Sequence, residues 1–266
     1  MAAQSQETLL YGVIAVLALL AFGFFCYRFK KARKEAERGM QDAKGKYDKV
    51  WDDLVKRNEC GIGDLAKLNA DFGIAAEDWN EQVQRFGPRD SVCTVIGRKL
   101  HIHPADDFVE LYKEAHKAQP KLLARADKWA KKHRGTREGD RVKDLKRALQ
   151  KTFRSYGGDS RKLCDLARTT IVFDSFDNMT DCLATIQSEM KMYAKISKKE
   201  QNRFNPRYTD WGDDWGGNVD GYRDMQLRVG IDGHVCEIQM HFHPVYKLKD
   251  AETQNNYTKF RDLMAK

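Results

Sequence analysis

Two acidic residues lie where a carboxylate needs a chemical reason to be. Glu237 falls in the alternating run VCEIQM, among residues that the pattern buries, and Asp165 comes just before the β-branched run TTIVF. A buried carboxylate needs a partner, a metal ion or a catalytic role. Two carboxylates on neighbouring strands can hold Mg²⁺ against phosphate groups. A magnesium site and a buried structural ion pair are therefore the two interpretations of this pair.

A basic segment, DRVKDLKRALQKTFRSYGG, precedes Asp165 and carries Arg141, Lys143 and Lys151. Its apolar residues recur at helical spacing and predict an amphipathic helix whose apolar stripe is made of Val142, Leu145, Leu149 and Phe153. Few carboxylates balance its other faces, so they are either solvated or directed at phosphate. The net charge of +8 also indicates an anionic partner, which could be a nucleotide, RNA or an acidic lipid surface.

The elements that must position these residues follow from hydrophobic periodicity. Period-2 alternation on both sides of Asp232-Gly233 predicts a β-hairpin that contains Glu237. A strand is expected over Thr169–Phe173, followed by a helix, and residues 105–135 predict one long helix bent at Pro120 or two helices in sequence. The fold class expected is α+β, with a mixed β-sheet flanked by helices.

The N-terminal third differs from the rest of the chain because it contains a long uncharged run. Residues 9–27, LLYGVIAVLALLAFGFFCY, contain no charge over a length that can cross a bilayer, which predicts a transmembrane anchor after a short tail at residues 1–8. A cleaved signal peptide is the alternative, but the first eight residues carry no basic side chain. The basic cluster from Arg28 to Lys34 then predicts a single-pass protein whose C-terminal body is cytoplasmic. Residues 28–104 are expected to form this juxtamembrane cluster and a helical spacer, or stalk.

The order of motifs over residues 105–266 resembles the RelA/SpoT-like nucleotidyltransferase domain of alarmone synthetases. The resemblance rests on RSYGGD at the end of the basic helix, on DLARTTIVF and NRF, and on GYRD followed by EIQMH. It implies a Mg²⁺-dependent GTP diphosphokinase that binds ATP and a guanine nucleotide and transfers pyrophosphate from ATP to the 3′-hydroxyl of GDP or GTP. It also implies a nucleotidyltransferase-like synthetase fold.

The same resemblance assigns roles to individual residues. Asp165 and Glu237 correspond to the metal-binding and catalytic carboxylates. The remaining positions match side chains that contact ATP, the acceptor nucleotide or phosphate. These are Arg141, Lys143 and Lys151 for ATP, Tyr222 and Arg203 for the acceptor, and Arg168 for a phosphate contact.

The acceptor region departs from the bacterial pattern of this family. Residues 218–220 are Asn-Val-Asp where a lysine is usual, Gln226 replaces a histidine and His241 replaces an arginine. Three functions therefore stay open: the pyrophosphokinase, a non-catalytic module of the same fold that binds nucleotide or RNA, and a different nucleotidyltransferase. His241 and His243 are a candidate metal pair, as are His101 and His103, and ordinary polar contacts are the alternative.

Overall fold

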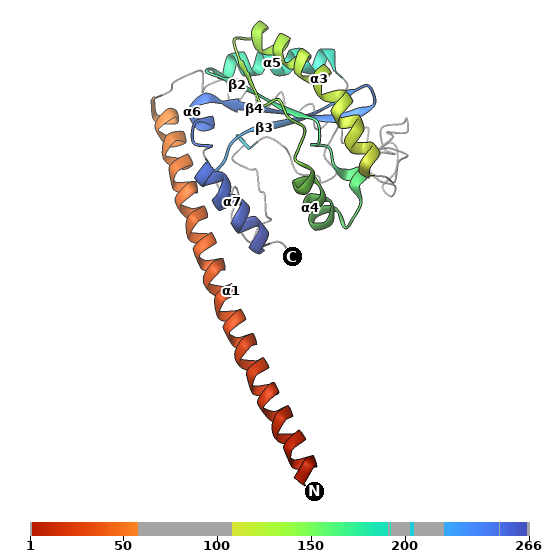
Figure 1. The fold of residues 1–266 in the computed structure, drawn as a ribbon. Coiled ribbons are helices and arrows are strands. Elements are labelled where there is room, and N and C mark those ends of the chain that lie inside the picture. Colours follow the sequence, from red (N-terminus) through yellow and green to blue (C-terminus); the bar gives the residue numbers. More distant parts are fainter. Residues whose placement is uncertain are drawn as a thin grey trace, which may run out of the picture. The chain divides into compact units, whose positions relative to one another are not determined.

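A computed structural model describes residues 2–57, 108–190, 192, 203–204, 221–249 and 251–264 (Figure 1). They belong to two compact units, one comprising Met1–Ala43 with Asp250–Lys266 and the other Lys44–Lys249. The helices are α1 (Ala2–Arg57), α3 (Phe108–Lys132), α4 (Leu145–Tyr156), the 3₁₀ turn η2 (Ser160–Lys162), α5 (Phe176–Glu189), α6 (His243–Tyr246) and α7 (Ala251–Met264). The strands are β1 (Thr136–Glu138), β2 (Arg168–Phe173), β3 (Met225–Ile231) and β4 (His234–Phe242).

The unit Lys44–Lys249 is built on a mixed four-stranded sheet in the order β1-β2-β4-β3. β4 pairs in parallel with β2 and antiparallel with β3, and β1 runs antiparallel to β2. The predicted hairpin is confirmed. Its turn residues Asp232 and Gly233 both have positive φ, 49° and 84°, as a two-residue turn of the I′ kind requires. The predicted α+β class with a mixed sheet agrees with this arrangement.

One face of the sheet is apolar and is covered by helices. Side chains of β2, β3 and β4 on this face are fully buried, and α3 and α5 pack against them (Figure 1). The face consists of Ile171, Phe173, Leu227, Val229, Ile238, Met240 and Phe242. Phe176, at the start of α5, stacks on Phe242 at a centroid distance of 4.5 Å. We call this surface the apolar face.

The opposite side of the same strands carries polar and charged side chains. Because directly paired residues point to the same side of a sheet, the register places Arg168 of β2, Glu237 of β4 and Arg228 of β3 in one row. Thr170, Gln239 and Gln226 form the next row, and His241 follows along β4. We call this surface the polar face. It holds one of the two carboxylates singled out from the sequence.

The structure contradicts the predicted transmembrane anchor. Among the described residues no helix is long and apolar enough to cross a membrane. This finding contradicts the predicted anchor at residues 9–27 and the single-pass location that was derived from it.

α1 continues without a break from Ala2 to Arg57. In the first unit it approaches α7 closely, since a Cβ on Gly39 would lie 3.1 Å from Cγ of Asn256. In the second unit its last turns bury Tyr47 and Leu54 in the core. Residues 44–57, which belong to the segment 28–104 expected to form the basic cluster and spacer, are thus part of the unit that holds the sheet.

The basic helix is shorter than expected and turned differently. α4 begins at Leu145, because the Asp144 side chain accepts a hydrogen bond from the amide of Arg147 and caps it, and it ends at Gly157 in the left-handed conformation. Its buried side chains are Ala148 and Thr152. Three residues of the predicted apolar stripe are instead exposed, namely Leu145, Leu149 and Phe153. His101 and His103 lie outside the described residues.

Candidate active site on the polar face

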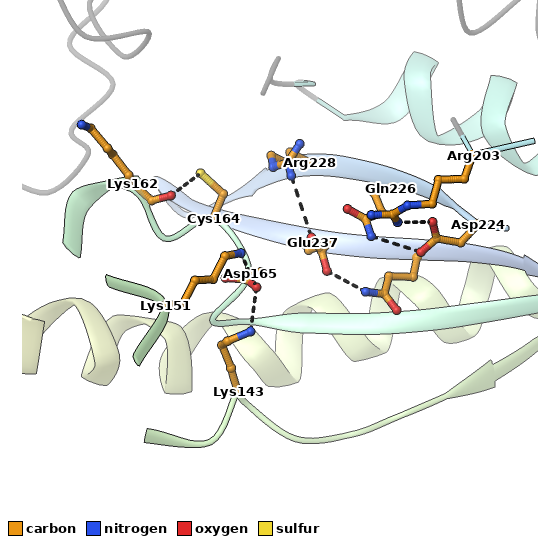
Figure 2. Close-up of polar contacts among 11 residues, drawn as sticks. Lys143, Lys151, Lys162, Cys164, Asp165, Arg203, Asp224, Gln226, Arg228 and Glu237 are labelled. Carbon is orange, nitrogen blue, oxygen red and sulfur yellow. Dashed lines mark hydrogen bonds and ion pairs between the residues drawn. The ribbon is translucent and has the colours of Figure 1, made fainter. Parts of the chain in front are cut away.

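Asp165 lies in the segment between η2 and β2 and is only 6% exposed. Its Oδ2 accepts hydrogen bonds from the Nζ atoms of Lys143 and Lys151, each at 2.8 Å (Figure 2). Two ammonium groups thus share one carboxylate, and the cluster carries one positive charge in excess. Asp165 Oδ1 is buried without a hydrogen-bond partner in the part of the chain that the structure describes.

Backbone contacts hold this cluster in place. The amide of Lys143 donates to the carbonyl of Leu166 at 2.8 Å, and the Lys143 carbonyl accepts from the hydroxyl of Tyr112 at 2.8 Å. Gln119 of α3 pairs reciprocally with the backbone of Arg168, with both bonds at 2.9 Å. The start of β2 and the segment before α4 are therefore fixed relative to each other, and Asp165 lies between them.

The electrostatics of the cluster favour its charged form. Burial by itself would raise the pKa of Asp165, but Lys151 and Lys143 outweigh it and hold that pKa well below its ordinary value. Burial opposes the charge on Lys151, yet Asp165, Tyr156 and Glu237 together raise the pKa of Lys151. Asp165 is consequently an ionised carboxylate and Lys151 an ammonium at neutral pH.

Glu237 is 4% exposed and lies in the middle of the polar face. Its Oε1 accepts from Nε2 of Gln239 at 2.9 Å, and its Oε2 lies 3.9 Å from Nη2 of Arg228 (Figure 2). The backbone amide of Glu237 donates to the carbonyl of Ala167 at 2.9 Å, which ties β4 to the chain just after Asp165. Glu237 accepts one side-chain hydrogen bond where Asp165 accepts two, and among the described residues no lysine lies within ion-pair distance of it.

Lys151 donates a hydrogen bond to Asp165, and the charge of Glu237 also helps to raise the pKa of Lys151. The arrangement brings two carboxylates and several cations to one side of the sheet, which suits binding and transfer of phosphate groups. The described residues contain no group of three or more His, Cys, Asp or Glu side chains that could hold a metal ion. Any metal here would be held by the two carboxylates with water or substrate oxygens.

A second charged cluster lies at the other end of the polar face. Asp224 is fully buried, and its Oδ1 lies 2.5 Å from Nη1 of Arg203 while its Oδ2 accepts from Gln226 at 3.1 Å. Burial would raise the pKa of Asp224, but Arg203 and His241 reverse this and lower it. Arg203 therefore reaches the site with its charge already balanced.

Tyr222 stands beside this cluster and is partly exposed. Its hydroxyl lies 2.9 Å from Nε2 of His241, and the ring is approached by Arg203 and Lys249 at 5.8 and 5.5 Å. Gly221 before it has φ of +69°, and a Cβ there would lie 2.9 Å from Cβ of Tyr47, so the position requires glycine. This explains the glycine of the GY motif in terms of packing against α1.

The histidine pair predicted as a possible metal half-site does not share a site. His241 is buried beside Tyr222, and burial lowers its pKa to about 3, although Asp224 partly offsets the effect. His243 instead lies 2.7 Å from Asp174 through Nδ1. Because His241 is neutral at pH 7, it does not supply the positive charge of an arginine at this position.

The structure brings together most, though not all, of the residues selected from the sequence. Lys143 and Lys151 meet at Asp165, whereas the side chain of Arg141 is 92% exposed and only 3.6 Å from its neighbour Asp140. Sequence reasoning did not select Arg228 and Gln239 on the polar face, or Asp224 and Lys249 beside it. The alternation of β3 and β4 carried a signal for Arg228 and Gln239, which share the face of Glu237.

Comparisons with known proteins add little. No family model and no curated protein matches the chain. It is similar to a solved structure described as the complex between the Type VI effector Tas1 and its immunity protein, with 22% identity and a TM-score of 0.39. The similarity covers 58% of this chain and 75% of the other. At this level it carries no argument about function.

Proposed function

We propose that the chain is a RelA/SpoT-like transferase that moves pyrophosphate from ATP to the 3′-hydroxyl of GDP or GTP. The observation that carries the proposal is the placement of Lys151. This lysine donates a hydrogen bond to Asp165, and the charge of Glu237 contributes to its raised pKa. A lysine and two carboxylates on one side of a sheet are groups that a phosphate-transfer site uses.

Lys143 and Lys151 form the ATP side of the site. Their shared carboxylate leaves one positive charge that a phosphate oxygen can neutralise, and the rigid backbone contacts of Lys143 fix its position before ATP arrives. Donors fixed in advance stabilise a developing negative charge without reorganisation. The family resemblance assigns the same role to Arg141, but its exposed side chain contacts neither carboxylate.

The residues present fit a bound Mg²⁺. Asp165 Oδ1 is buried and lacks a partner among the described residues, and carboxylate oxygens are the ligands that Mg²⁺ prefers. Asp165 would hold the ion, with Glu237 as the second carboxylate. When bound, Mg²⁺ neutralises charge that develops on the transferred phosphates.

Glu237 accepts the proton of the attacking hydroxyl. The 3′ oxygen forms a bond to the β-phosphorus of ATP while the bond from that phosphorus to the oxygen bridging the α-phosphate breaks. AMP leaves, the β- and γ-phosphates remain on the acceptor, and the proton goes to Glu237. Gln239 holds one oxygen of Glu237 and leaves Oε2, 3.9 Å from Arg228, as the atom that takes the proton.

Tyr222 and Arg203 form the acceptor side. The partly exposed ring of Tyr222 offers a surface for the guanine, and Arg203 packs near the same ring. Burial and three hydrogen-bonded or ring contacts hold this tyrosine in one orientation, which favours a defined position for the base.

The test is product analysis with the full chain. Incubation with Mg²⁺, ATP and GDP should release AMP and give a guanosine nucleotide heavier by two phosphate groups, and omission of GDP should abolish both. Mass spectrometry separates this from transfer of a single nucleotide, which would release pyrophosphate. Intact ATP after long incubation with GDP and with GTP would contradict the proposal.

A non-catalytic module that binds nucleotide or RNA is the second candidate. It is supported by the structural partners that Asp165, Glu237 and Asp224 already have, since paired carboxylates are also what a retained fold without turnover contains. In that case salt-sensitive RNA binding should survive Glu237→Gln, and no AMP should form.

A further inference from the structure

The cations on and beside the polar face differ in whether a carboxylate neutralises them. Lys143 and Lys151 are paired with Asp165, Arg203 with Asp224, and Arg228 lies within 4 Å of Glu237. For these residues an incoming anion competes with a carboxylate that is already in place.

Lys249 and Arg168 are different. Within the described parts of the chain, no carboxylate lies within ion-pair distance of either side chain, although both are only partly exposed. Burial lowers the pKa of Lys249, and Arg168 and Arg203 add to that effect while Asp224 and Glu237 oppose it. A half-buried cation without a counter-ion is costly, and a bound anion removes that cost.

Lys249 also occupies the middle of the proposed acceptor side. Its Nζ lies 5.5 Å from the ring centre of Tyr222, 5.7 Å from that of Tyr246 and 3.5 Å from Oε1 of Gln239. Gln239 in turn bonds Glu237. Lys249 therefore lies between the tyrosine proposed to hold the guanine and the carboxylate proposed to receive the 3′ proton.

We propose that Lys249 binds the 5′-phosphate groups of the acceptor nucleotide and so selects a guanosine phosphate over guanosine. The inference rests on the proposed function, because it uses the placement of the acceptor between Tyr222 and Glu237. Arg168, one row along the polar face from Gln239, is the second cation available to the same phosphates. Lys143 and Lys151 remain for ATP, so the two substrates use separate lysines.

The experiment measures binding without turnover. Calorimetric titration of the full chain with GDP, with guanosine and with ATP, each alone in Mg²⁺ buffer, gives three affinities for each variant. Wild type should bind GDP at least about tenfold more tightly than guanosine. Lys249→Met should reduce that preference about tenfold, while its affinities for guanosine and ATP stay within about twofold.

Two variants make the result specific. Lys249→Arg keeps a cation and should restore most of the preference for GDP. Lys247→Met alters an exposed lysine two residues earlier and should bind like wild type. The inference is overturned if Lys249→Met changes GDP binding no more than Lys247→Met does, if it weakens guanosine equally, or if wild type shows no preference for GDP.

Failure of the proposed function gives a different result. A chain that binds GDP through Lys249 yet releases no AMP from ATP refutes the pyrophosphokinase and leaves the phosphate-binding role intact. A chain that makes the product with unchanged nucleotide preference in Lys249→Met refutes only the inference.

Discussion

The two faces of the sheet belong to the same strands, yet they obey different physical rules. On the apolar face, side chains such as Phe173 and Phe242 are buried by α3 and α5 and need nothing beyond apolar neighbours. On the polar face, Glu237 is almost as buried but is surrounded by Arg228, Gln239 and the charge of Lys151. We therefore expect stability to depend mainly on the apolar face and the proposed chemistry on the polar face.

Replacing Asp165 should reduce both the stability of the fold and the rate of nucleotide turnover. Asp165→Asn leaves Lys143 and Lys151 without their counter-charge, and breaking a buried ion pair in this way costs about 3–5 kcal/mol. The free energy of unfolding from denaturant titration should fall by that order, and nucleotide turnover should be lost as well. Unchanged stability would show that the two lysines do not depend on Asp165.

Phe176 should affect stability alone. It is fully buried against Phe242, Phe204 and Trp51, so Phe176→Ala should lower the free energy of unfolding by about 3–5 kcal/mol. Turnover per folded molecule, measured at a temperature where the variant is folded, should stay near the wild-type value. A specific loss of turnover in the folded variant would break the division between the faces.

Lys151 and Arg141 sharpen the assignment of the ATP side. Lys151→Met removes a partly buried ammonium that is bonded to Asp165 and should raise KM for ATP about tenfold or more. Arg141→Met changes an exposed side chain and should raise KM by a much smaller factor. Equal effects in steady-state assays would mean that ATP lies against the exposed side of the segment before α4.

His241 should make the free energy of unfolding depend on pH. Its pKa falls from 6.5 to about 3 on folding, mainly by burial, so below pH 6.5 the unfolded chain binds a proton that the folded chain does not. Stability contributed by the neutral ring is therefore lost as the pH falls from about 6.5 towards 3. His241→Asn should reduce this slope by up to about 1.4 kcal/mol per pH unit in denaturant titrations at several pH values. An unchanged slope would contradict the buried, neutral state of the ring.

The sheet was the most predictable part of the chain. Alternation and Asp232-Gly233 placed β3 and β4 to within two residues at each end, and the β-branched run located β2, observed as Arg168–Phe173. The long helix with Pro120 in its interior is observed as the single α3. These patterns succeed because each depends on local periodicity and one buried face. β1, with three residues, offers no such pattern.

The site was predictable in its carboxylates and not in their partners. Alternation marked Glu237 as a buried acid, but the meeting of Lys143 and Lys151 at Asp165 depends on where α4 begins, and the cap at Asp144 leaves Lys143 outside the helix. Arg203 and Asp224 are 21 residues apart and meet through tertiary packing alone. Lys249 follows the last strand with no periodic signal, so only the fold places it beside Tyr222.

The transmembrane prediction depended on composition alone. An uncharged run of sufficient length is the usual signal for a span, but among the described residues no helix has the length and hydropathy that a span requires. The helix instead continues into the unit of the sheet, where Tyr47 packs against Tyr222.

The most direct test of the central claim is AMP release by wild type and by Glu237→Gln, side by side with ATP, GDP and Mg²⁺. Glutamine keeps the size of the side chain and the bond to Gln239 but removes the group that we propose takes the proton, so the rate per folded molecule should fall by about 10²–10⁴-fold. Equal rates in the two proteins would contradict the account.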